Sequence, residues 1–302
     1  MTAEQQIEGC NYRDDLPKVS VIVPVYNGEA DLPHLAICLC AQTYPAQQVE
    51  YLIVDNGSCD RTASLLQTLV SDFAAVGLTL RILSETQIQS SYAARNAGIC
   101  VASGEIFAFT DADCRPQPDW LRTLIQPFED SAISLVAGEI KALPGTTLWE
   151  KYADREDTLT QKHTLAHPFC PYGQTANLAI RRMALEKVGL FRPYLTTGGD
   201  ADICWRIQRQ GAGQLYFADQ AIVQHRHRTT IQDLRKQWAR YGRSNRYLHE
   251  LHGVKLMRDL APREYLHRMI RWCLKELPIT GARVMAGKTP AVDLLRSPIG
   301  LF

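Results

Sequence analysis

The 302-residue sequence lacks any apolar run of about 18 residues, and a membrane-spanning helix needs roughly 20. Its first residues lack the basic and apolar stretches of a secretory signal peptide, so we expect neither a signal peptide nor a transmembrane span. It also lacks a Cys-x-x-Cys pair, although it contains nine cysteines. This absence argues against a structural zinc site and favours reduced thiols in a cytoplasmic compartment. Several cysteines fall on helix faces that the pattern predicts to be buried, namely Cys38, Cys40, Cys100 and Cys204.

The composition is that of a globular protein, with 46% hydrophobic and 22% charged residues, which excludes global disorder. The net charge of +1 hides an asymmetry. Residues 226–302 contain 16 Lys and Arg against 6 Asp and Glu, whereas residues 1–225 contain 17 against 26. A basic segment with interleaved aromatic residues can meet anionic lipid, a phosphorylated acceptor or nucleic acid, and a solvated helical surface is the alternative.

Short apolar runs alternate with helical patterns in the first 110 residues. The predicted strands span residues 19–25, 51–54, 78–83 and 105–109. The predicted helices span residues 32–39, the stretch from Ser58 or Asp60 to Leu69, and residues 92–102. This order predicts right-handed crossovers and an α/β fold, with a doubly wound, mostly parallel sheet covered by helices on both faces. Such sheets bind ligands at the carboxyl ends of their strands.

Beyond residue 136 the pattern is less regular. We expect helices over residues 148–163, 182–188, 198–209 and 230–250, with strands over 175–180 and 215–224. The resulting domain prediction is an N-terminal extension (1–17), a catalytic domain (18–228) and a basic helical C-terminal segment (229–302).

Two carboxylates, Asp111 and Asp113, follow the fourth predicted strand directly. Carboxylate oxygens are the ligands that Mg²⁺ and Mn²⁺ prefer, and this edge of the sheet is where a ligand would bind. Taken alone, an Asp pair is also typical of a solvated turn. Other parts of the sequence decide between these readings.

Five stretches, in this order, resemble family 2 glycosyltransferases of the GT-A fold. They are residues 19–27 (VSVIVPVYN), 54–58 (VDNGS), 94–99 (ARNAGI), 111–113 (DAD) and 199–206 (GDADICWR). The resemblance implies an inverting enzyme that moves a sugar from a nucleotide-diphosphate donor to an acceptor hydroxyl.

The resemblance also implies a donor site. Pro24 and Tyr26 would line the nucleobase pocket, and Asp55 would accept a hydrogen bond from the base. Arg95 and Asn96 would stand on a helix beside the donor crevice. The alternatives are a half-buried core aromatic for Tyr26 and a turn hydrogen bond for Asp55.

By the same resemblance, Asp113 is a direct ligand of a divalent cation, and Asp111 contacts the ribose or a coordinated water. His225 is the expected third ligand, with a structural histidine as the alternative. The implied cofactor is Mn²⁺ or Mg²⁺, and an imidazole ligand favours Mn²⁺. Such an ion offsets the charge that develops on a diphosphate leaving group.

On the acceptor side, the resemblance makes Asp200 the general base and puts Asp202, Gly173 and Asn177 in the acceptor or sugar region. The sequence departs from the family at Gly199, where the family has Glu. As the alternative, Asp200 and Asp202 cap a helix, and Asp202 pairs with the residue four positions later.

The predicted enzyme is cytoplasmic, with peripheral contact at the inner membrane face through the basic segment. Its predicted partners are the donor and a lipid-linked or saccharide acceptor, without nucleic acid. The Gln-x-x-Arg-Trp signature of processive synthases is absent, which favours the addition of one or a few sugars.

Two other functions remain open. A sugar-phosphate nucleotidyltransferase would carry a glycine-rich loop with a basic residue after the first strand, whereas residues 24–28 contain one glycine and no cation. A catalytically degenerate nucleotide-sugar binding module is the second alternative, and Gly199 is the feature that favours it.

Overall fold

The structure, a computed structural model, describes residues 16–156, 158–254 and 261–295. The signal-peptide prediction and most of the predicted N-terminal extension concern residues 1–15, which lie outside this description.

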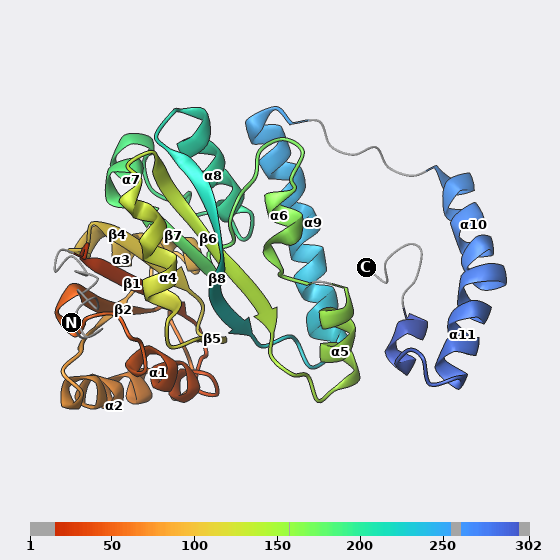
Figure 1. The fold of residues 1–302 in the computed structure, drawn as a ribbon, viewed down its shortest axis with the longest axis horizontal. Helices are drawn as coiled ribbons and strands as arrows, with labels where there is room; N and C mark the ends of the chain where they lie inside the picture. Colours follow the sequence, from red (N-terminus) through yellow and green to blue (C-terminus); the bar gives the residue numbers. More distant parts are fainter. Residues whose placement is uncertain (1–15, 157, 255–260, 296–302) are drawn as a thin grey trace, which may run out of the picture.

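One mixed sheet forms the centre of the molecule, with the strand order β3-β2-β1-β4-β7-β6-β8-β5 (Figure 1). The strands are β1 (Val19–Val25), β2 (Val49–Asp55), β3 (Thr79–Ser84), β4 (Ile106–Thr110), β5 (Cys114–Pro116), β6 (Ile133–Ala142), β7 (Asn177–Arg181) and β8 (Gln214–His225). Strands β1 to β4 are parallel, as are β6 and β8. The β4–β7, β6–β7 and β5–β8 pairs are antiparallel. The predicted fold class is therefore confirmed, with the antiparallel pairs confined to the half beyond β4.

Helices cover both faces of the sheet. They are α1 (Leu32–Cys40), α2 (Thr62–Ala75), α3 (Ser91–Val101), α4 (Trp120–Ile125), α5 (Leu148–Arg155), α6 (Gln161–Leu165), α7 (Arg182–Val188), α8 (Gly199–Arg209), α9 (Ile231–His252), α10 (Pro262–Arg271) and α11 (Leu277–Met285). Short 3₁₀ or π turns complete the structure: η1 (Ala46–Gln48), η2 (Gln126–Glu129), η3 (Trp272–Glu276) and η4 (Ala291–Leu295).

Two apolar cores result, because successive side chains of a strand point to opposite faces. Val21 and Val23 of β1 pack with α1, α2 and α4 in one cluster. Ile22 between them packs with α3, α7 and α8 in the other. Pro24 lies beyond Ile22, the last residue of β1 that pairs with β4, as expected for a proline near a strand end.

The looser second half departs from prediction in several places. The single helix expected over residues 148–163 is wrong, because α5 ends at Arg155 and α6 begins at Gln161. Between them Leu159 has φ 68°, a left-handed conformation that a helix cannot contain. The prediction also omitted β5, β6 and α4. Cys204 is buried as expected, but Cys38 and Cys40 are only partly buried and Cys100 is exposed.

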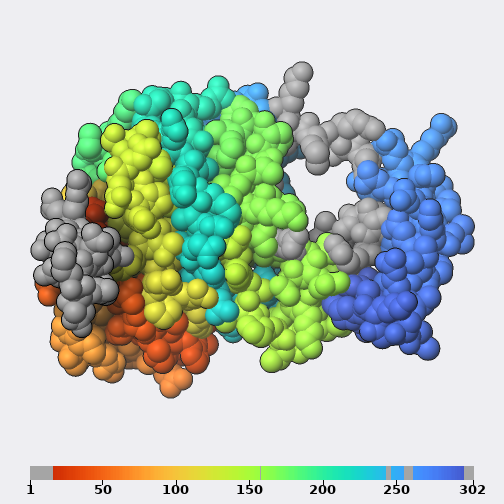
Figure 2. All heavy atoms as spheres, in the orientation of Figure 1, coloured from red at the N-terminus to blue at the C-terminus, as the bar shows by residue number. Residues whose placement is uncertain are grey.

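The C-terminal segment has two parts of different character. Leu248 of α9 packs on Trp205 of α8, so α9 belongs to the body of the molecule. The segment from α10 through η3 to α11 has no buried side chain. Beyond α11, Asp293 of η4 accepts two hydrogen bonds from Arg155 of α5, at 2.8 and 2.7 Å. Figure 2 shows the blue C-terminal region touching the green part of the body. No helix among the described residues is long and apolar enough to cross a membrane.

A buried carboxylate joins the strands that carry the site. Glu50 of β2 accepts hydrogen bonds at 2.6 Å from the Ser20 hydroxyl of β1 and from the Ser103 amide, which precedes β4. Burial raises the pKa of Glu50, but the hydrogen bonds from Ser20 and Ser103 outweigh it and leave the pKa below its ordinary value. The ionised form of Glu50 therefore stabilises the folded state.

We expect the stabilisation from Glu50 to be complete above the unfolded-state pKa of about 4.3 and to be lost as pH falls through the lower folded-state pKa. Glu50→Gln should cost about 1–3 kcal/mol at neutral pH and should lose less stability in acid than the wild type. Urea unfolding at neutral and acidic pH measures both effects. Glu29→Gln, at a surface ion pair, is the control. Equal acid sensitivity of the wild type and Glu50→Gln would contradict this assignment.

Candidate active site

The residues predicted from the strand ends gather at one edge of the sheet. Asp55 is the last residue of β2, and Tyr26 directly follows β1. Asp111 and Asp113 follow β4, and His225 ends β8. Because β5 pairs with β8 in antiparallel register, Cys114 lies opposite His225 and brings Asp113 beside it.

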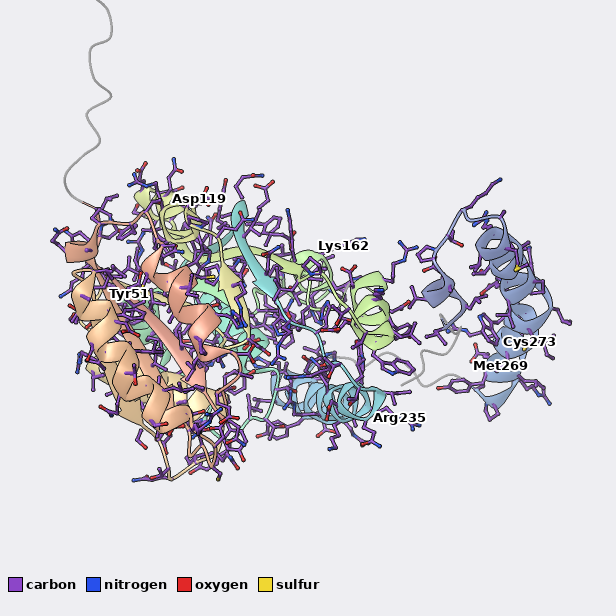
Figure 3. All side chains as sticks on the ribbon, turned by 90° about the horizontal axis from the view of Figure 1, so that it is seen from below. Tyr51, Asp119, Lys162, Arg235, Met269 and Cys273 are labelled. Atoms are coloured by element: carbon purple, nitrogen blue, oxygen red, sulfur yellow. The ribbon has the colours of Figure 1, made fainter. Side chains whose placement is uncertain are left out.

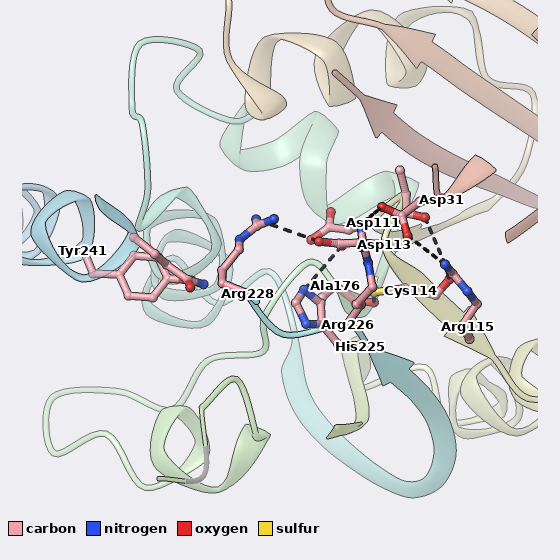
Figure 4. Close-up of polar contacts among 12 residues, drawn as sticks. Asp31, Asp111, Asp113, Cys114, Arg115, Ala176, His225, Arg226, Arg228 and Tyr241 are labelled. Atoms are coloured by element: carbon pink, nitrogen blue, oxygen red, sulfur yellow. Dashed lines mark hydrogen bonds and ion pairs between the residues drawn. The ribbon is translucent and has the colours of Figure 1, made fainter. Parts of the chain in front are cut away.

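Asp113 contacts two basic side chains that come from the end of β8 and the turn after it (Figure 4). Its Oδ1 lies 3.3 Å from His225 Nε2, and its Oδ2 lies 3.9 Å from Arg228 Nη2. Burial raises the pKa of Asp113, but His225 and Arg228 outweigh burial and hold it well below its ordinary value. Burial lowers the pKa of His225, and Asp113 more than reverses this, so the net shift is upward. The upward shift of the His225 pKa and the downward shift of the Asp113 pKa both favour the charged forms of the pair.

Asp111 is directed to a different partner. Its Oδ1 accepts a hydrogen bond at 2.5 Å from Arg95 Nη2, and only 3% of the Arg95 side chain is exposed. The Arg95 guanidinium also lies over the Tyr92 ring, 5.4 Å from its centroid. The pKa of Asp111 is raised by burial first and then by the nearby charges of Asp113 and Asp200, against the opposing effect of Arg95.

The donor atoms of Asp113 and His225 fit a divalent cation. A carboxylate oxygen and an imidazole nitrogen suit Mn²⁺, and a hard cation often takes only one or two protein ligands with the rest from substrate phosphates. No group of three His, Cys, Asp or Glu side chains forms a ready metal site in the described part of the chain. Asp111, the other predicted metal contact, is occupied by Arg95. The geometry thus supports Asp113 and His225 as protein ligands more directly than Asp111.

Asp200 stands in the first turn of α8. Gly198 before it has φ 78°, the left-handed conformation that glycine adopts easily, and this turns the chain into the helix. The Thr175 hydroxyl donates a hydrogen bond to Asp200 Oδ1 at 2.9 Å. Burial and then the charge of Asp200 raise the pKa of Tyr92, so a phenol lies close to this carboxylate.

The profile of the family described as glycosyl transferase family 2 matches residues 20–189, more than half of the chain. The chain belongs to glycosyl transferase family 2. A second profile, described as glycosyl transferase family group 2, matches residues 106–286.

Similar proteins agree with this membership. The chain is 35% identical over 249 residues to glycosyltransferase AglE of Haloferax volcanii, which covers 82% of this chain and 79% of that protein. It is 30% identical over 241 residues to the pre-mycofactocin glycosyltransferase of Mycobacterium tuberculosis, with 78% of this chain but only 47% of that protein covered. Family membership indicates glycosyl transfer as the general reaction.

A solved structure supports the GT-A fold. The mannosyltransferase PcManGT of Pyrobaculum calidifontis, in complex with GDP-Man and Mn²⁺, superposes with a TM-score of 0.62 at 21% identity. The superposition covers 93% of this chain and 79% of that protein.

The departure of this family 2 member at Gly199 has a structural reason. A Cβ at Gly199 would lie 2.7 to 2.8 Å from three ring atoms of Tyr92. Real side-chain carbons do not come this close, so the Tyr92 ring fills the space that the family's Glu would need. The sequence shows the missing Glu but carries no signal for the aromatic ring that packs against Gly199.

Asn177 requires a correction, because it does not face a sugar. The residue is fully buried, and its Nδ2 donates to the carbonyls of Glu139 and Ala221 at 2.8 and 2.7 Å. Its Oδ1 accepts a hydrogen bond from Trp120 Nε1 at 2.8 Å. The amide of Asn177 therefore ties β6, β7, β8 and α4 together.

Asp202 is also internal, and its predicted place in the acceptor region is corrected. It is fully buried, with Oδ1 3.1 Å from Arg192 Nε and 2.9 Å from His252 Nε2. Its Oδ2 accepts from Arg206 Nε at 3.0 Å, which is the helical pair foreseen as the alternative. Asp202 connects α8 to α9.

Two further predicted residues have structural partners. The side-chain amide of Asn96 donates a hydrogen bond to the Phe191 carbonyl at 2.8 Å and accepts one from the Phe191 amide at 3.1 Å, while its contact with the donor stays a prediction. Gly173 lies where a Cβ would come within 2.8 Å of Ala137 and Leu178, so its role is close packing on β6 and β7.

For the residues predicted to contact the nucleobase, the structure is compatible with both the predicted contact and the structural alternative. Half of the Tyr26 surface, 51%, is exposed, and Pro24 is buried beside it. Asp55 Oδ1 accepts a hydrogen bond from the Ser58 amide at 3.1 Å, the turn contact that its alternative requires. Contact with a base stays a prediction for all three residues.

Sequence analysis missed an ion-pair cluster next to the site (Figure 4). Asp31, before α1, accepts a hydrogen bond from Arg115 Nη2 at 2.8 Å and a short one from Arg226. The Arg226 amide also donates to the Asp113 carbonyl at 3.1 Å. The cluster joins α1, β5 and the end of β8, and no motif in the sequence announces it.

We expect Gly199→Glu, which restores the family residue, to destabilise the protein by about 1–3 kcal/mol, because it overpacks against Tyr92. Gly242→Glu is the matched control, since Gly242 is exposed on α9 with open space around it. Gly242→Glu should leave the free energy of unfolding unchanged or raise it by up to about 1 kcal/mol, because Glu favours a helix more than Gly does. Thermal unfolding measures the stability of both variants. Equal melting temperatures of Gly199→Glu and Gly242→Glu would refute the steric account.

Proposed function

We propose that this family 2 member is an inverting, metal-dependent glycosyltransferase. It transfers one or a few sugars from a nucleotide-diphosphate sugar to an acceptor hydroxyl, in the synthesis of a polysaccharide, glycolipid or other glycoconjugate. One observation carries the proposal: in a chain of this family, Asp113 Oδ1 and His225 Nε2 lie 3.3 Å apart at the strand-end edge of the sheet, where their oxygen and nitrogen suit a divalent cation. The candidate base, Asp200, stands in the first turn of α8 and is held by Thr175.

The donor end of the reaction rests on the Asp113–His225 pair. When bound there, Mn²⁺ or Mg²⁺ neutralises charge on the diphosphate leaving group. Arg228, which already lies 3.9 Å from Asp113, adds a positive charge next to the same position. Arg95 holds Asp111 in place, and Asp111 is left to contact the ribose.

The acceptor end rests on Asp200. The Thr175 hydroxyl holds one carboxylate oxygen at 2.9 Å and so orients the group. The acceptor oxygen forms a bond to the anomeric carbon as the bond to the diphosphate breaks, and its proton passes to Asp200. A single displacement with one base and no covalent intermediate inverts the anomeric configuration.

Different observations argue against the two alternative functions, the nucleotidyltransferase and the binding module. Membership of glycosyl transferase family 2 favours glycosyl transfer over nucleotidyl transfer. The binding-module alternative loses its main argument, because Tyr92 explains Gly199 sterically while Asp200 and Thr175 remain paired. Turnover by the wild type is the test that separates an enzyme from a binding module.

Asp200→Asn should lower turnover by about 10² to 10⁴, because the base is lost, and should leave donor affinity unchanged. UDP, GDP and dTDP sugars with Mn²⁺ are screened first, with donor hydrolysis as the readout. Asp113→Asn is the comparison variant and should weaken Mn²⁺-dependent donor binding instead. Normal turnover of Asp200→Asn would remove it as the base.

We further propose a lipid-linked or anionic acceptor and peripheral contact at the cytoplasmic face of the inner membrane. The segment from α10 to α11 exposes apolar side chains at four-residue spacing, with Leu266, Ile270 and Leu274 61%, 48% and 76% exposed. The Lys and Arg residues of the same segment are Arg263, Arg268, Arg271, Lys275 and Arg283. Figure 3 shows this segment, marked by Met269 and Cys273, standing apart from the sheet. An exposed helix with apolar and basic side chains is suited to an anionic lipid surface.

The wild type should co-sediment with vesicles that contain anionic lipid more than with neutral vesicles. Leu266→Ser/Leu274→Ser should weaken this binding, since apolar area is lost from the helix. Ile37→Ser, at an exposed apolar residue of α1, is the control. Sedimentation that is indifferent to anionic lipid or to the double substitution would exclude this membrane contact.

A further inference from the structure

A cavity of about 480 Å³ lies between the end of β8 and the first turns of α9. Its volume falls in the range of small-molecule sites. Its lining comes from two short stretches and comprises Arg226, His227, Arg228, Thr229, Asp233, Lys236, Gln237 and Arg240.

The lining is strongly cationic, with four Lys and Arg side chains, one histidine and one carboxylate. The carboxylate, Asp233, already accepts a 2.7 Å hydrogen bond from Thr230 at the start of α9. Its contact with Lys236 is long, at 3.9 Å. Arg240 has no carboxylate partner within the described residues. Arg226 pairs with Asp31, and Arg228 lies 3.9 Å from Asp113, so the positive charge that is left for a ligand comes mainly from Arg240 and Lys236.

The cavity also contains buried polar groups, which separates it from an ordinary basic surface. His227 is only 6% exposed, and its Nε2 has no hydrogen-bond partner in the part of the chain that the structure describes. Gln237 is 7% exposed and is held by a 2.8 Å hydrogen bond from its Nε2 to the Tyr241 hydroxyl. A buried imidazole without a partner is costly unless a ligand satisfies it.

Arg228 connects this cavity to the candidate active site. Its Nη2 lies 3.9 Å from Asp113 Oδ2, and Figure 4 shows it between Asp113 and Tyr241. The lining includes neither Asp113 nor Asp200. A ligand in the cavity would thus sit beside the predicted cation position while remaining separate from the carboxylates that the proposed reaction uses.

We propose that this cavity, lined by the β8–α9 turn and α9, binds a phosphate group of a substrate. Arginine side chains bind phosphate oxygens with paired hydrogen bonds, and Lys236 adds a point charge. The phosphate can come from a phosphorylated acceptor or from the donor diphosphate. The choice between these sources rests on the proposed function, whereas the binding of phosphate does not.

Binding is tested on the full chain with inorganic pyrophosphate in EDTA, so that no cation links the probe to Asp113. Calorimetry should detect binding to the wild type and an affinity at least about tenfold lower for Lys236→Gln/Arg240→Gln, because two charged contacts with the probe are lost. Arg235→Gln and Arg235→Gln/Arg246→Gln, which change α9 residues outside the lining, are the controls (Figure 3). Absence of binding, or an equal loss in the control with two substitutions, would overturn the proposal.

The source is found with two further ligands and the same variants. If Lys236→Gln/Arg240→Gln weakens farnesyl phosphate binding and spares UDP or GDP binding with Mn²⁺, the phosphate is the acceptor's. If it weakens nucleoside diphosphate binding instead, the phosphate is the donor's. Unchanged binding of both ligands would overturn the substrate assignment. Asp200→Asn should bind pyrophosphate normally, so a failed base assignment remains distinguishable from a failed cavity assignment.

Discussion

The contact between Asp113 and His225, at 3.3 Å, is the interaction on which the architecture of the site depends. It joins residues far apart in sequence through three residues of antiparallel pairing between β5 and β8. The pairing continues into the bond from the Arg226 amide to the Asp113 carbonyl, and Asp31 then clamps Arg226 against α1. One short strand thus sets the positions of the candidate cation ligands and of Arg226 and Arg228, which line the cavity between β8 and α9.

Sequence patterns predicted the first half of the fold well, because β1, β2 and β4 are apolar runs that end in polar turns. Such runs leave a clear signal, and they also locate Asp111 and Asp113 at the edge where ligands bind. The looser second half was harder. The left-handed Leu159 that separates α5 from α6 has no compositional signal, and the three-residue β5 is too short to produce a periodic pattern.

The site residues also fall into two groups, those whose place could be predicted from the sequence and those whose place could not. Residues at strand ends could be predicted by resemblance, since their position follows from topology. Asn177 and Asp202 could not be sorted in this way, because a polar residue in a motif can serve a ligand or the interior, and only their partners distinguish the two. Tyr92 and Gly199 form one steric unit across two helices, which a single sequence does not reveal.

The anchoring of α9 has a mechanical consequence. Near its start the helix lines the basic cavity, and at its far end Leu248 packs on Trp205 while His252 bonds Asp202. Trp205 and Asp202 belong to α8, the same helix that carries Asp200 in its first turn. The 22 residues of α9 thus form one continuous helix that contributes Lys236 and Arg240 to the cavity and Leu248 and His252 to the contacts with α8. The wall of the cavity and the support of the helix that carries Asp200 are therefore parts of the same element.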